Sequence, residues 1–325
     1  MILVTGGAGF IGSVLIRELN NAGRDDVSVV DRLRDTTKWL NLRDAKFNEY
    51  VHADTFFTPG MELLHNKIDF IFHIGACSST TERDVDFLMN NNVNYSKSLW
   101  AMALENNIPL VYASSAATYG DGELGYDDDH QKIPKLKPLN PYGWSKQLFD
   151  QWVLKRPKSP PRWYGLKYFN VFGPNEYHKN DMRSLVHKGY EQIRETSKIR
   201  LFKSHKKGFK DGEQLRDFIY VKDVCKAMLR MMDKNCTAES GIYNIGTGQE
   251  RSFKDLALAT FEAMKIEDSI EYFDMPDSIR NQYQYFTKAN MEKFHKNFSD
   301  FQFTTLEESV ADYVKNYLMN KSRYY

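Results

Sequence analysis

The first twelve residues constrain the fold more than any other part of the chain. Residues 1–5 form a short apolar run, Gly6, Gly9 and Gly12 punctuate the next segment, and an amphipathic helical pattern covers 10–21. Glycine lets the backbone turn sharply from a strand into a helix and lets another group approach closely. The N–H groups at the start of that helix then point outward, where they attract a phosphate. The segment therefore predicts a strand, a tight turn and a helix that opens on an anion-binding site.

A second predicted strand, Val27 to Asp31, ends in an acidic residue. In a dinucleotide-binding βαβ unit, an acid about 20 residues after the glycines bonds to the adenosine ribose. The glycines are three apart, which is wider than the usual fingerprint, so a plain structural turn is the alternative. The flanking strand and helix, together with Asp31, favour a dinucleotide site.

Apolar runs alternate with helical patterns along most of the chain. Strands are predicted at 70–76, 110–115, 162–171 and 241–245, with a long helix over 84–105. Strands that are apolar throughout suit a parallel sheet that helices cover on both faces. We predict an α/β fold, a Rossmann-like doubly wound parallel sheet with a smaller, interleaved α/β substrate domain. Its ligand crevice is expected at the carboxyl ends of the strands.

The predicted nucleotide-binding domain comprises 1–171 plus about 217–246, and the substrate domain comprises about 172–216 plus 247–325, with a hinge at Gly173-Pro174. Asp217 to Val221 is expected to return to the main sheet. The stretch 203–214 is rich in glycine and lysine and is expected to form an exposed loop.

Composition excludes several classes of function. The 44 Lys and Arg residues against 43 Asp and Glu leave a net charge of +1, which provides no global field for nucleic acid or an acidic membrane. No apolar run approaches the roughly 20 residues that span a bilayer, and the first strand begins at residue 2, so we expect a cytoplasmic protein. Cys77, Cys225 and Cys236 lack metal-ligand spacing, so reduced thiols and no metal site are expected.

A tyrosine and a lysine begin a predicted helix in the middle of the chain. Tyr142 and Lys146 are four residues apart, so they share one helix face. A phenol has a pKa near 10 and needs a neighbouring cation to act as a base at neutral pH. Ser115 ends the strand at 110–115 and could bond a reacting oxygen, with Thr118 as a second candidate. A packed tyrosine is the alternative, but beside the glycine turn the pair predicts proton transfer next to a nicotinamide.

The residues after the second strand bear on the choice of cofactor. Asp31 alone would favour NAD, because a carboxylate repels a 2′-phosphate. Arg32 follows directly and Lys38 is near, and both could neutralise that phosphate, although a solvated basic loop would explain either residue taken singly. We predict NADP, one per subunit, with NAD as the alternative.

The chain resembles the extended short-chain dehydrogenase/reductase family that acts on nucleotide sugars, and within it the branch that epimerises ADP-linked heptoses. The glycine turn and the Tyr142/Lys146 pair match the whole family. The run Ala-Cys-Ser-Ser-Thr-Thr-Glu at 76–82 and the His-Lys at 178–179 carry the narrower resemblance. Further matching segments lie at 36–42, 112–120, 168–174, 216–221 and 283–287.

This resemblance implies that NADP oxidises the C6 hydroxyl of ADP-D-glycero-D-manno-heptose, the transient ketone rotates, and the hydride returns to the other face to give the L-glycero epimer. Such a reaction serves the synthesis of the lipopolysaccharide core. It needs two proton-transfer groups, and Tyr142 matches the first while Lys179 matches the second, on the opposite side of the sugar. A homo-oligomer, a pentamer by resemblance, is also implied.

The predicted catalytic residues are Tyr142, Lys146, Ser115 and Lys179. The predicted cofactor residues are Gly6, Gly9, Phe10, Ile11, Gly12, Asp31, Arg32, Lys38, Ile74, Gly75, Ala76, Cys77, Ser78, Asn91, Tyr142, Lys146, Val171 and Lys179. The predicted substrate residues are Ser115, Asn170, Asp181, Lys188, Phe202, Lys203, Ser204, Arg216 and Tyr283. The planar guanidinium of Arg216 suits a diphosphate.

Some positions depart from the family pattern. Ala53 stands where a second lysine is common, Asp181 replaces a small hydroxyl residue, and Lys188 occupies the place of a sugar-contacting histidine, with His187 one position earlier. The stretch 204–214 is also longer than expected. These changes surround the sugar and the nucleotide, so the preference for either could differ while the hydride chemistry stays the same.

Two other functions remain open. A nucleotide-sugar 4-epimerase or dehydratase shares the glycine turn and the Tyr142/Lys146 pair, but a dehydratase needs a carboxylate directly after the catalytic hydroxyl residue, and Ala116 and Ala117 follow Ser115. A non-catalytic NAD(P)-sensing protein has no need to keep Ser115, Tyr142 and Lys146 together.

Overall fold

The computed structural model describes residues 1–280 and 283–325 and is organised around a parallel sheet of seven strands. The strand order is β10-β6-β5-β4-β1-β2-β3, and every neighbouring pair is parallel. The strands are β1 (Ile2–Thr5), β2 (Val27–Asp31), β3 (Glu49–His52), β4 (Phe70–His73), β5 (Leu110–Ser115), β6 (Trp163–Tyr168) and β10 (Gly241–Ile245). Except for β3 at the edge, these strands are almost wholly buried, which explains their continuous apolar sequences. The predicted doubly wound sheet is confirmed.

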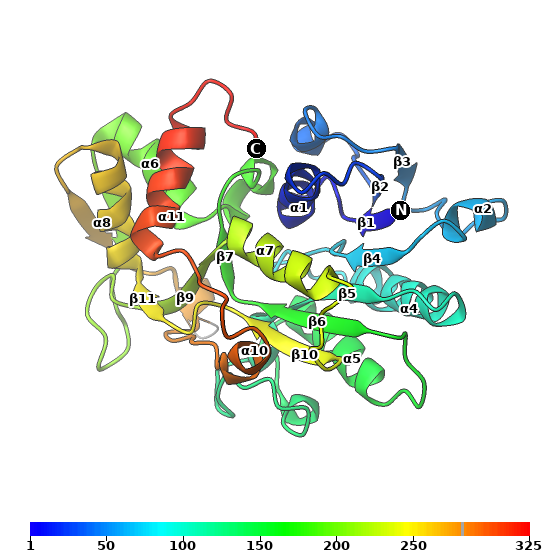
Figure 1. Cartoon of the computed structure of the whole chain (residues 1–325). Coiled ribbons are helices and arrows are strands. Elements are labelled where there is room, and N and C mark those ends of the chain that lie inside the picture. The colour runs from blue at the N-terminus through cyan, green and yellow to red at the C-terminus, as the bar shows by residue number, and fades with distance from the viewer. Residues whose placement is uncertain (281–282) are drawn as a thin grey trace.

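Helices cover both faces of this sheet (Figure 1). The helices α1 (Phe10–Asn21) and α7 (Val221–Met232) lie side by side on one face, and α4 (Tyr95–Glu105) and α5 (Pro141–Leu154) lie on the other. The start of α5 is fixed by Asn140, whose side chain accepts a hydrogen bond from the Gly143 N–H at 2.8 Å, and by Pro141 in the first turn. This cap sets the orientation of the helix that carries Tyr142 and Lys146.

The predicted helix over 84–105 forms, but it is not regular. It comprises α3 (Val85–Leu88), a π-helical turn (Met89–Asn94) and α4 without a break. A π-helical turn inserts an extra residue and is common beside functional sites. Here it turns Asn91 and Asn92 toward neighbouring loops.

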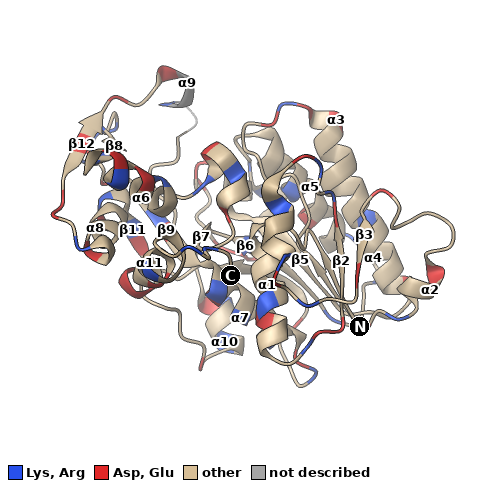
Figure 2. Cartoon of the chain, turned by 90° about the horizontal axis from the view of Figure 1, so that it is seen from above, with Lys and Arg blue, Asp and Glu red and all other residues tan. Residues whose placement is uncertain are grey.

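The rest of the chain builds a smaller part beside the sheet (Figure 2). A three-stranded sheet has the order β11-β9-β7, and β8 pairs with β12. These strands are β7 (Asn170–Phe172), β8 (Ile199–Phe202), β9 (Leu215–Tyr220), β11 (Glu250–Ser252) and β12 (Ile270–Phe273), and the main helices are α6 (Leu185–Thr196), α8 (Phe253–Met264) and α11 (Leu306–Tyr313). Shorter helices are α2 (Glu62–His65), α9 (Asp277–Arg280) and α10 (Glu292–Asn297), with helical turns at 37–42, 116–119, 133–135, 177–182 and 314–318. Basic and acidic residues are interspersed over both parts (Figure 2).

The prediction that residues 217–221 return to the main sheet was wrong. Residues 217–220 belong to β9, which pairs with β7 and β11 instead, and Val221 begins α7. The place beside β6 is taken by β10, and the Phe169 N–H donates to the Ile245 carbonyl at 3.1 Å where β6 ends. The chain then leaves the main sheet as β7, so β9 finds its partner there. The domain boundaries given above stay a prediction.

A buried ion pair lies behind the carboxyl end of β5. The Lys167 ammonium is 2.6 Å from an Asp150 oxygen, and both side chains are fully shielded from solvent. The hydroxyls of Tyr112 and Ser114 also donate to Asp150, at 3.0 and 2.7 Å. These bonds join β5, β6 and α5, so the strand that ends in Ser115 is fixed to the helix that carries Tyr142.

We expect Lys167→Met to lower the free energy of unfolding by about 3–5 kcal/mol, because the Asp150 carboxylate would stay buried without its cation. Urea denaturation of the purified protein measures this loss. Lys132→Met is the control, because Lys132 pairs with Asp127 at a site where its side chain is 44% exposed. That variant should unfold close to the parent protein, because exposed ion pairs add little stability. An equal loss in the two variants would contradict the expectation.

Candidate active site

The turn after β1 and the turn after β4 are in backbone contact. Gly6 has a φ of +68°, and a Cβ atom there would lie 2.5 Å from the Gly75 Cα. A Cβ atom on Gly12 would lie 2.2 Å from the Gly6 carbonyl oxygen. Gly9 caps α1 without a side-chain hydrogen bond, so the first N–H groups of the helix open on the space beside the turn. Only glycine fits this approach, and the helix start can hold a diphosphate.

A cavity of about 720 Å³ opens at the carboxyl ends of the central strands. All eighteen predicted cofactor residues line it: Gly6, Gly9, Phe10, Ile11, Gly12, Asp31, Arg32, Lys38, Ile74, Gly75, Ala76, Cys77, Ser78, Asn91, Tyr142, Lys146, Val171 and Lys179. Two of the predicted substrate residues, Ser115 and Asn170, line it as well. Residues from seven separate stretches of the sequence are thus brought to one cavity, which suits a dinucleotide.

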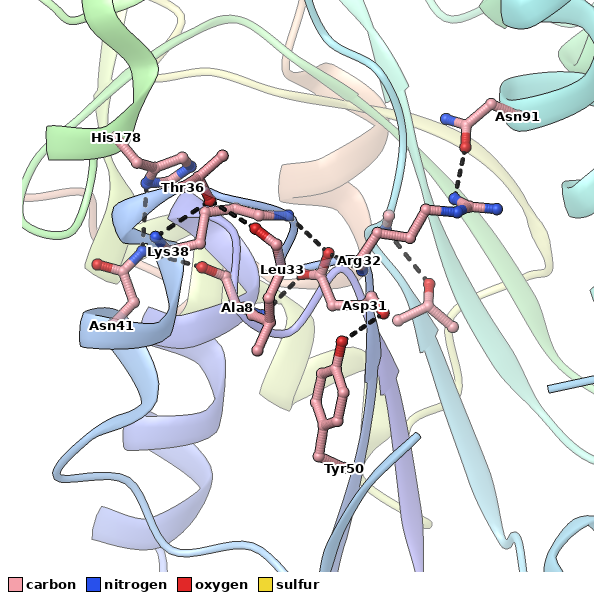
Figure 3. A network of polar contacts seen from close by, with 12 residues as sticks. Ala8, Asp31, Arg32, Leu33, Thr36, Lys38, Asn41, Tyr50, Asn91 and His178 are labelled. Carbon is pink, nitrogen blue, oxygen red and sulfur yellow. Dashed lines mark hydrogen bonds and ion pairs between the residues drawn. The ribbon is translucent and has the colours of Figure 1, made fainter. Parts of the chain in front are cut away.

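Asp31 lies at the centre of a network at one end of this cavity (Figure 3). One carboxylate oxygen accepts the Ala8 N–H at 2.9 Å. The other accepts the Arg32 N–H and the Lys38 ammonium, both at 2.7 Å. The Asp31 carbonyl accepts the Tyr50 hydroxyl at 2.8 Å. Asp31 is thereby held at the cavity wall, with its charge balanced by Lys38.

The predicted proton-transfer pair lies on the first turns of α5. Tyr142 and Lys146 are buried and both line the cavity. The Lys146 ammonium donates to the Ala113 carbonyl at 2.9 Å, and burial lowers the pKa of this lysine to about 8, against the opposing charge of Asp150. Burial raises the pKa of the Tyr142 phenol, and the adjacent Ser115 side chain opposes that rise. The phenol is therefore neutral at rest and needs a nearby cation when it gives up a proton.

Thr118 is not a candidate for substrate contact. Its side chain is fully buried behind β5, where the hydroxyl donates to the Ser115 carbonyl at 2.8 Å and accepts from Lys167 at 2.7 Å. It lies outside the residues that line the cavity. Ser115, which ends the strand on the cavity side, remains the candidate, because the 3₁₀ turn after β5 directs Thr118 backward.

Asn92 joins the loop after β4 to α5. Its side-chain oxygen accepts the Cys77 N–H at 2.9 Å, and its amide donates to the Cys77 carbonyl and to the Ser145 hydroxyl, both at 3.0 Å. The Asn92 side chain therefore bridges structural groups. The side-chain amide of its neighbour Asn91 donates to the same Asn92 oxygen at 3.0 Å, and the Asn91 oxygen accepts from Arg32 at 2.8 Å.

Lys179 reaches the same cavity from the helical turn at 177–182. Its ammonium lies 5.2 Å from the centre of the Phe10 ring. Burial lowers the pKa of Lys179, and the carboxylate of Glu176 acts in the opposite direction. Glu176 is itself buried, and its carboxylate accepts the Ser184 N–H at 2.7 Å and the Tyr313 hydroxyl at 3.0 Å. A partly desolvated lysine is thus held beside the cavity with a fixed negative charge nearby.

The loop before Lys179 is fastened on three sides through Asn175. Its side-chain amide donates to the Ser13 hydroxyl of α1 at 3.0 Å, and its oxygen accepts the Tyr325 N–H at 2.9 Å. The Asn175 carbonyl accepts the side-chain amide of Asn41 at 3.2 Å. Tyr325 therefore helps to position the loop, a contact that no local sequence pattern indicates.

The other predicted substrate residues form a second group, in the smaller part. The Arg216 guanidinium is buried and lies over the rings of Tyr283 and Phe253, at 5.1 and 5.6 Å. The Phe202 ring is 6.1 Å from that of Tyr283. Phe253 in turn lines the cavity, so this cluster continues the cavity wall toward the smaller part.

The remaining four predicted substrate residues, Asp181, Lys188, Lys203 and Ser204, lie outside the cavity lining. The Lys188 ammonium donates to the Asp181 carbonyl. Lys203 is 3.6 Å from Asp274, and the Ser204 N–H donates to Asp211 at 2.7 Å. The side chains of Lys188 and Lys203 are thus engaged by neighbours. The proposed contact of all four residues with the sugar or nucleotide rests on the resemblance alone.

The comparisons with known proteins agree with this geometry. The model of the NAD dependent epimerase/dehydratase family matches residues 2–246. The chain is 48% identical over 334 aligned residues to a Fusobacterium nucleatum protein named ADP-L-glycero-D-manno-heptose-6-epimerase, covering 100% of both chains. The chain belongs to the NAD dependent epimerase/dehydratase family. Membership in this family makes the dinucleotide that fits the cavity a nicotinamide cofactor.

Solved structures of this epimerase/dehydratase fold are also similar. The Helicobacter pylori ADP-L-glycero-D-manno-heptose-6-epimerase is 29% identical, with a TM-score of 0.79, over 97% of this chain and 95% of that one. MoeE5, solved in complex with UDP-glucuronic acid and NAD, is 25% identical, with a TM-score of 0.74, over 95% and 96%. Among the described residues, no helix has the length and apolar character needed to cross a membrane.

The sequence analysis missed several residues that line the cavity. They are Arg34, Thr36, Glu82, Phe87, Tyr95, His178, Leu185, Phe218, Phe253 and Leu256. His178 could have been found, because it directly precedes Lys179 in the quoted motif. Tyr95 begins α4 after the irregular π-helical turn, and Phe218, Phe253 and Leu256 come from the smaller part, so no local pattern marks them.

We expect Gly12→Ala to lower the affinity for a nicotinamide nucleotide by at least about tenfold, or ~1.4 kcal/mol. The added methyl group would press on the Gly6 carbonyl and open the turn that faces the diphosphate. Isothermal titration measures the affinity. Gly9→Ala is the matched control, because its Cβ atom would lie 3.0 Å from the Gly6 carbonyl oxygen. If both variants bind as the parent does, the turn does not hold the diphosphate.

Proposed function

We propose that this chain epimerises ADP-D-glycero-D-manno-heptose at C6 by transient oxidation and reduction, using Tyr142 and Lys179 as its two proton-transfer groups. The observation that carries the proposal is that these two groups reach one cavity from different elements, α5 and the turn at 177–182. A simple dehydrogenase needs one such group, whereas inversion at a carbinol needs one for each face. The shared activity of its full-length relatives, to which it is up to 48% identical, supplies the sugar.

The glycine turn and Asp31 would hold the cofactor. The start of α1 suits the diphosphate, and the Asp31 carboxylate suits an adenosine ribose hydroxyl. When bound, the nicotinamide takes a hydride from the sugar carbon and later returns it. The small residues from Ile74 to Ser78 let the backbone pass close to the cofactor.

Tyr142 is proposed to exchange a proton with the C6 oxygen on one face of the sugar. Ser115 lies beside it and would bond the same oxygen, so the two hydroxyls fix the reacting group. Lys146, one helical turn along, would lower the cost of forming the phenolate by its positive charge. Its depressed pKa of about 8 leaves it mainly charged at neutral pH.

Lys179 is proposed to act on the other face. An ordinary lysine is too basic to give and take protons readily near neutral pH, and burial reduces that basicity. The ketone formed in the first half-reaction has to turn so that its other face meets the returning hydride. We place the turning sugar on the side of the cavity where Phe253 joins the lining to the Arg216 cluster.

The nucleotide part of the substrate is proposed to bind in the smaller part. Arg216 carries a planar array of donors that suits a diphosphate, and it is already desolvated between two aromatic rings. Phe202 and Tyr283 supply aromatic rings against which an adenine would pack. The resemblance further supports a homo-oligomer, with a pentamer as the proposed state.

NADP is the proposed cofactor, supported by Arg32 and Lys38 at the adenosine end of the cavity. The Lys38 ammonium bonds the Asp31 carboxylate, and Arg32 directly follows Asp31 and lines the same end of the cavity. Identification by chromatography of the nucleotide released when the purified protein is denatured tests this choice directly, because NADP and NAD differ by one phosphate.

We expect Tyr142→Phe to reduce turnover by about 10²–10⁴-fold, because the ring is kept and only the proton-transfer group is removed. The 6-epimer formed from ADP-heptose is followed by NMR. Tyr243→Phe serves as the control, since Tyr243 is buried on β10 away from the cavity and its hydroxyl bonds the Glu239 carbonyl. Unchanged turnover in Tyr142→Phe would reject the mechanism.

The pH dependence of turnover tests the role of Lys179. One of the two groups must start as a base and the other as an acid, so a bell-shaped profile is expected. The negative charge of Glu176 raises the pKa of Lys179. Glu176→Gln should therefore lower that pKa and move one limb of the profile to lower pH, while the other limb stays in place.

Tyr313→Phe is the control for this shift, because it removes one hydrogen bond to Glu176 and leaves the negative charge. Its two limbs should stay where they are in the parent. A limb that moves equally in both variants would mean that the loop has shifted, and Lys179 would lose its support as the second proton-transfer group.

A further inference from the structure

Arg32, one of the two cations that could hold a 2′-phosphate, is already engaged by other groups. Its Nε donates to an Asp54 oxygen at 2.7 Å, and one terminal nitrogen donates to the Asn91 oxygen at 2.8 Å. Its guanidinium carbon lies 5.8 Å from the centre of the Tyr95 ring. Figure 3 shows the side chain extending from the end of β2 toward Asn91, away from Lys38.

The register of the sheet brings Asp54 to this place. Asp31 is paired with His52, the last residue of β3, and the chain continues through Ala53, which lines the cavity. The Ala53 N–H donates to the Asp31 carbonyl at 3.0 Å, so the loop is held against the end of β2. Asp54 comes next, and its side chain is 59% exposed. It is thus a solvent-facing carboxylate beside the ribose end of the cavity.

The charges at this end of the cavity are arranged as two pairs. Lys38 is bound to Asp31, and Arg32 is bound to Asp54. Arg34 and Glu82, also in the cavity lining, add one charge of each sign further along. A ribose hydroxyl needs only an acceptor such as Asp31, whereas a 2′-phosphate needs cations that are free to turn toward it.

We propose that Asp54 is a specificity-determining residue that competes with the cofactor's 2′-phosphate for Arg32 and so narrows the preference for NADP over NAD. An arginine presents the same fork of donors to a carboxylate and to a phosphate. A phosphate that takes the Nε edge of Arg32 must displace Asp54 and meet its negative charge. NAD, which lacks that phosphate, leaves the pair intact. This inference rests on the proposed cofactor role of Arg32 and goes beyond it by naming the group that opposes it.

Removal of the Asp54 carboxylate is therefore expected to change the affinity for NADP and to leave the affinity for NAD nearly the same. Exposed ion pairs are weak, so the effect is moderate: Asp54→Asn should tighten NADP binding by about three- to tenfold. Its affinity for NAD should change by less than about twofold. Asp54→Glu keeps the negative charge and should behave like the parent protein.

The experiment measures the dissociation constants of NADP and NAD by isothermal titration, together with the ratio of the two nucleotides released on denaturation of each purified variant. Asp44→Asn is the matched control, because Asp44 has the same exposed fraction, 59%, and pairs with Arg43 outside the cavity. It makes the same change in net charge and should move neither constant. A selective gain for NADP in Asp54→Asn alone supports the inference.

Two results would overturn it. Equal gains for NADP and NAD, or an equal gain in the Asp44 control, would show a general effect of charge. An unchanged dissociation constant for NADP in Asp54→Asn, with both nucleotides binding normally to the parent, would show that Asp54 does not compete with the 2′-phosphate for Arg32. If the parent bound neither nucleotide, the proposed cofactor itself would be wrong, and that failure is distinct from the other two.

Discussion

The close approach of two backbone turns is the constraint on which the rest of the site depends. Because Gly6 and Gly75 have no side chains, the turn after β1 touches the turn after β4. The cavity forms beside that contact, bounded by the start of α1 on one side and by the loop from Ile74 to Ser78 on the other. Any side chain at Gly6 would separate the turns and, with them, the two walls.

From that contact the positions of the proton-transfer groups follow through hydrogen bonds. Asn92 joins the Cys77 loop to Ser145 on α5, three residues after Tyr142. Asp150, on the same helix, joins it to β5 through Ser114 and to β6 through Lys167. On the far wall, buried Glu176 and Asn175 fasten the loop of Lys179 to α11, α1 and the C-terminal residue. Buried polar groups that are fully bonded in this way hold side chains in fixed positions.

Burial also sets the chemistry of these groups. It lowers the pKa of Lys146 and Lys179 and raises that of Tyr142. Burial has opposite effects because it disfavours the charged form, which is the protonated amine but the deprotonated phenol. A negative neighbour then raises the pKa of each lysine in part: Asp150 acts on Lys146, and Glu176 acts on Lys179. The same pairing at the other end of the cavity joins Asp31 to Lys38 and Asp54 to Arg32. The site is therefore an arrangement of opposed charges within a partly desolvated space.

The sequence by itself determined the local elements and the residue types of the site. The boundaries of β1, α1, β2, β5 and β10 follow from apolar runs, glycines and caps, because these signals act between residues close in the chain. Only the tertiary structure decided that β9 pairs with β7, that Thr118 faces away from the cavity, and that Asp54 meets Arg32. Each of these depends on which strand end lies beside which, and sheet order and register join residues that no local pattern relates.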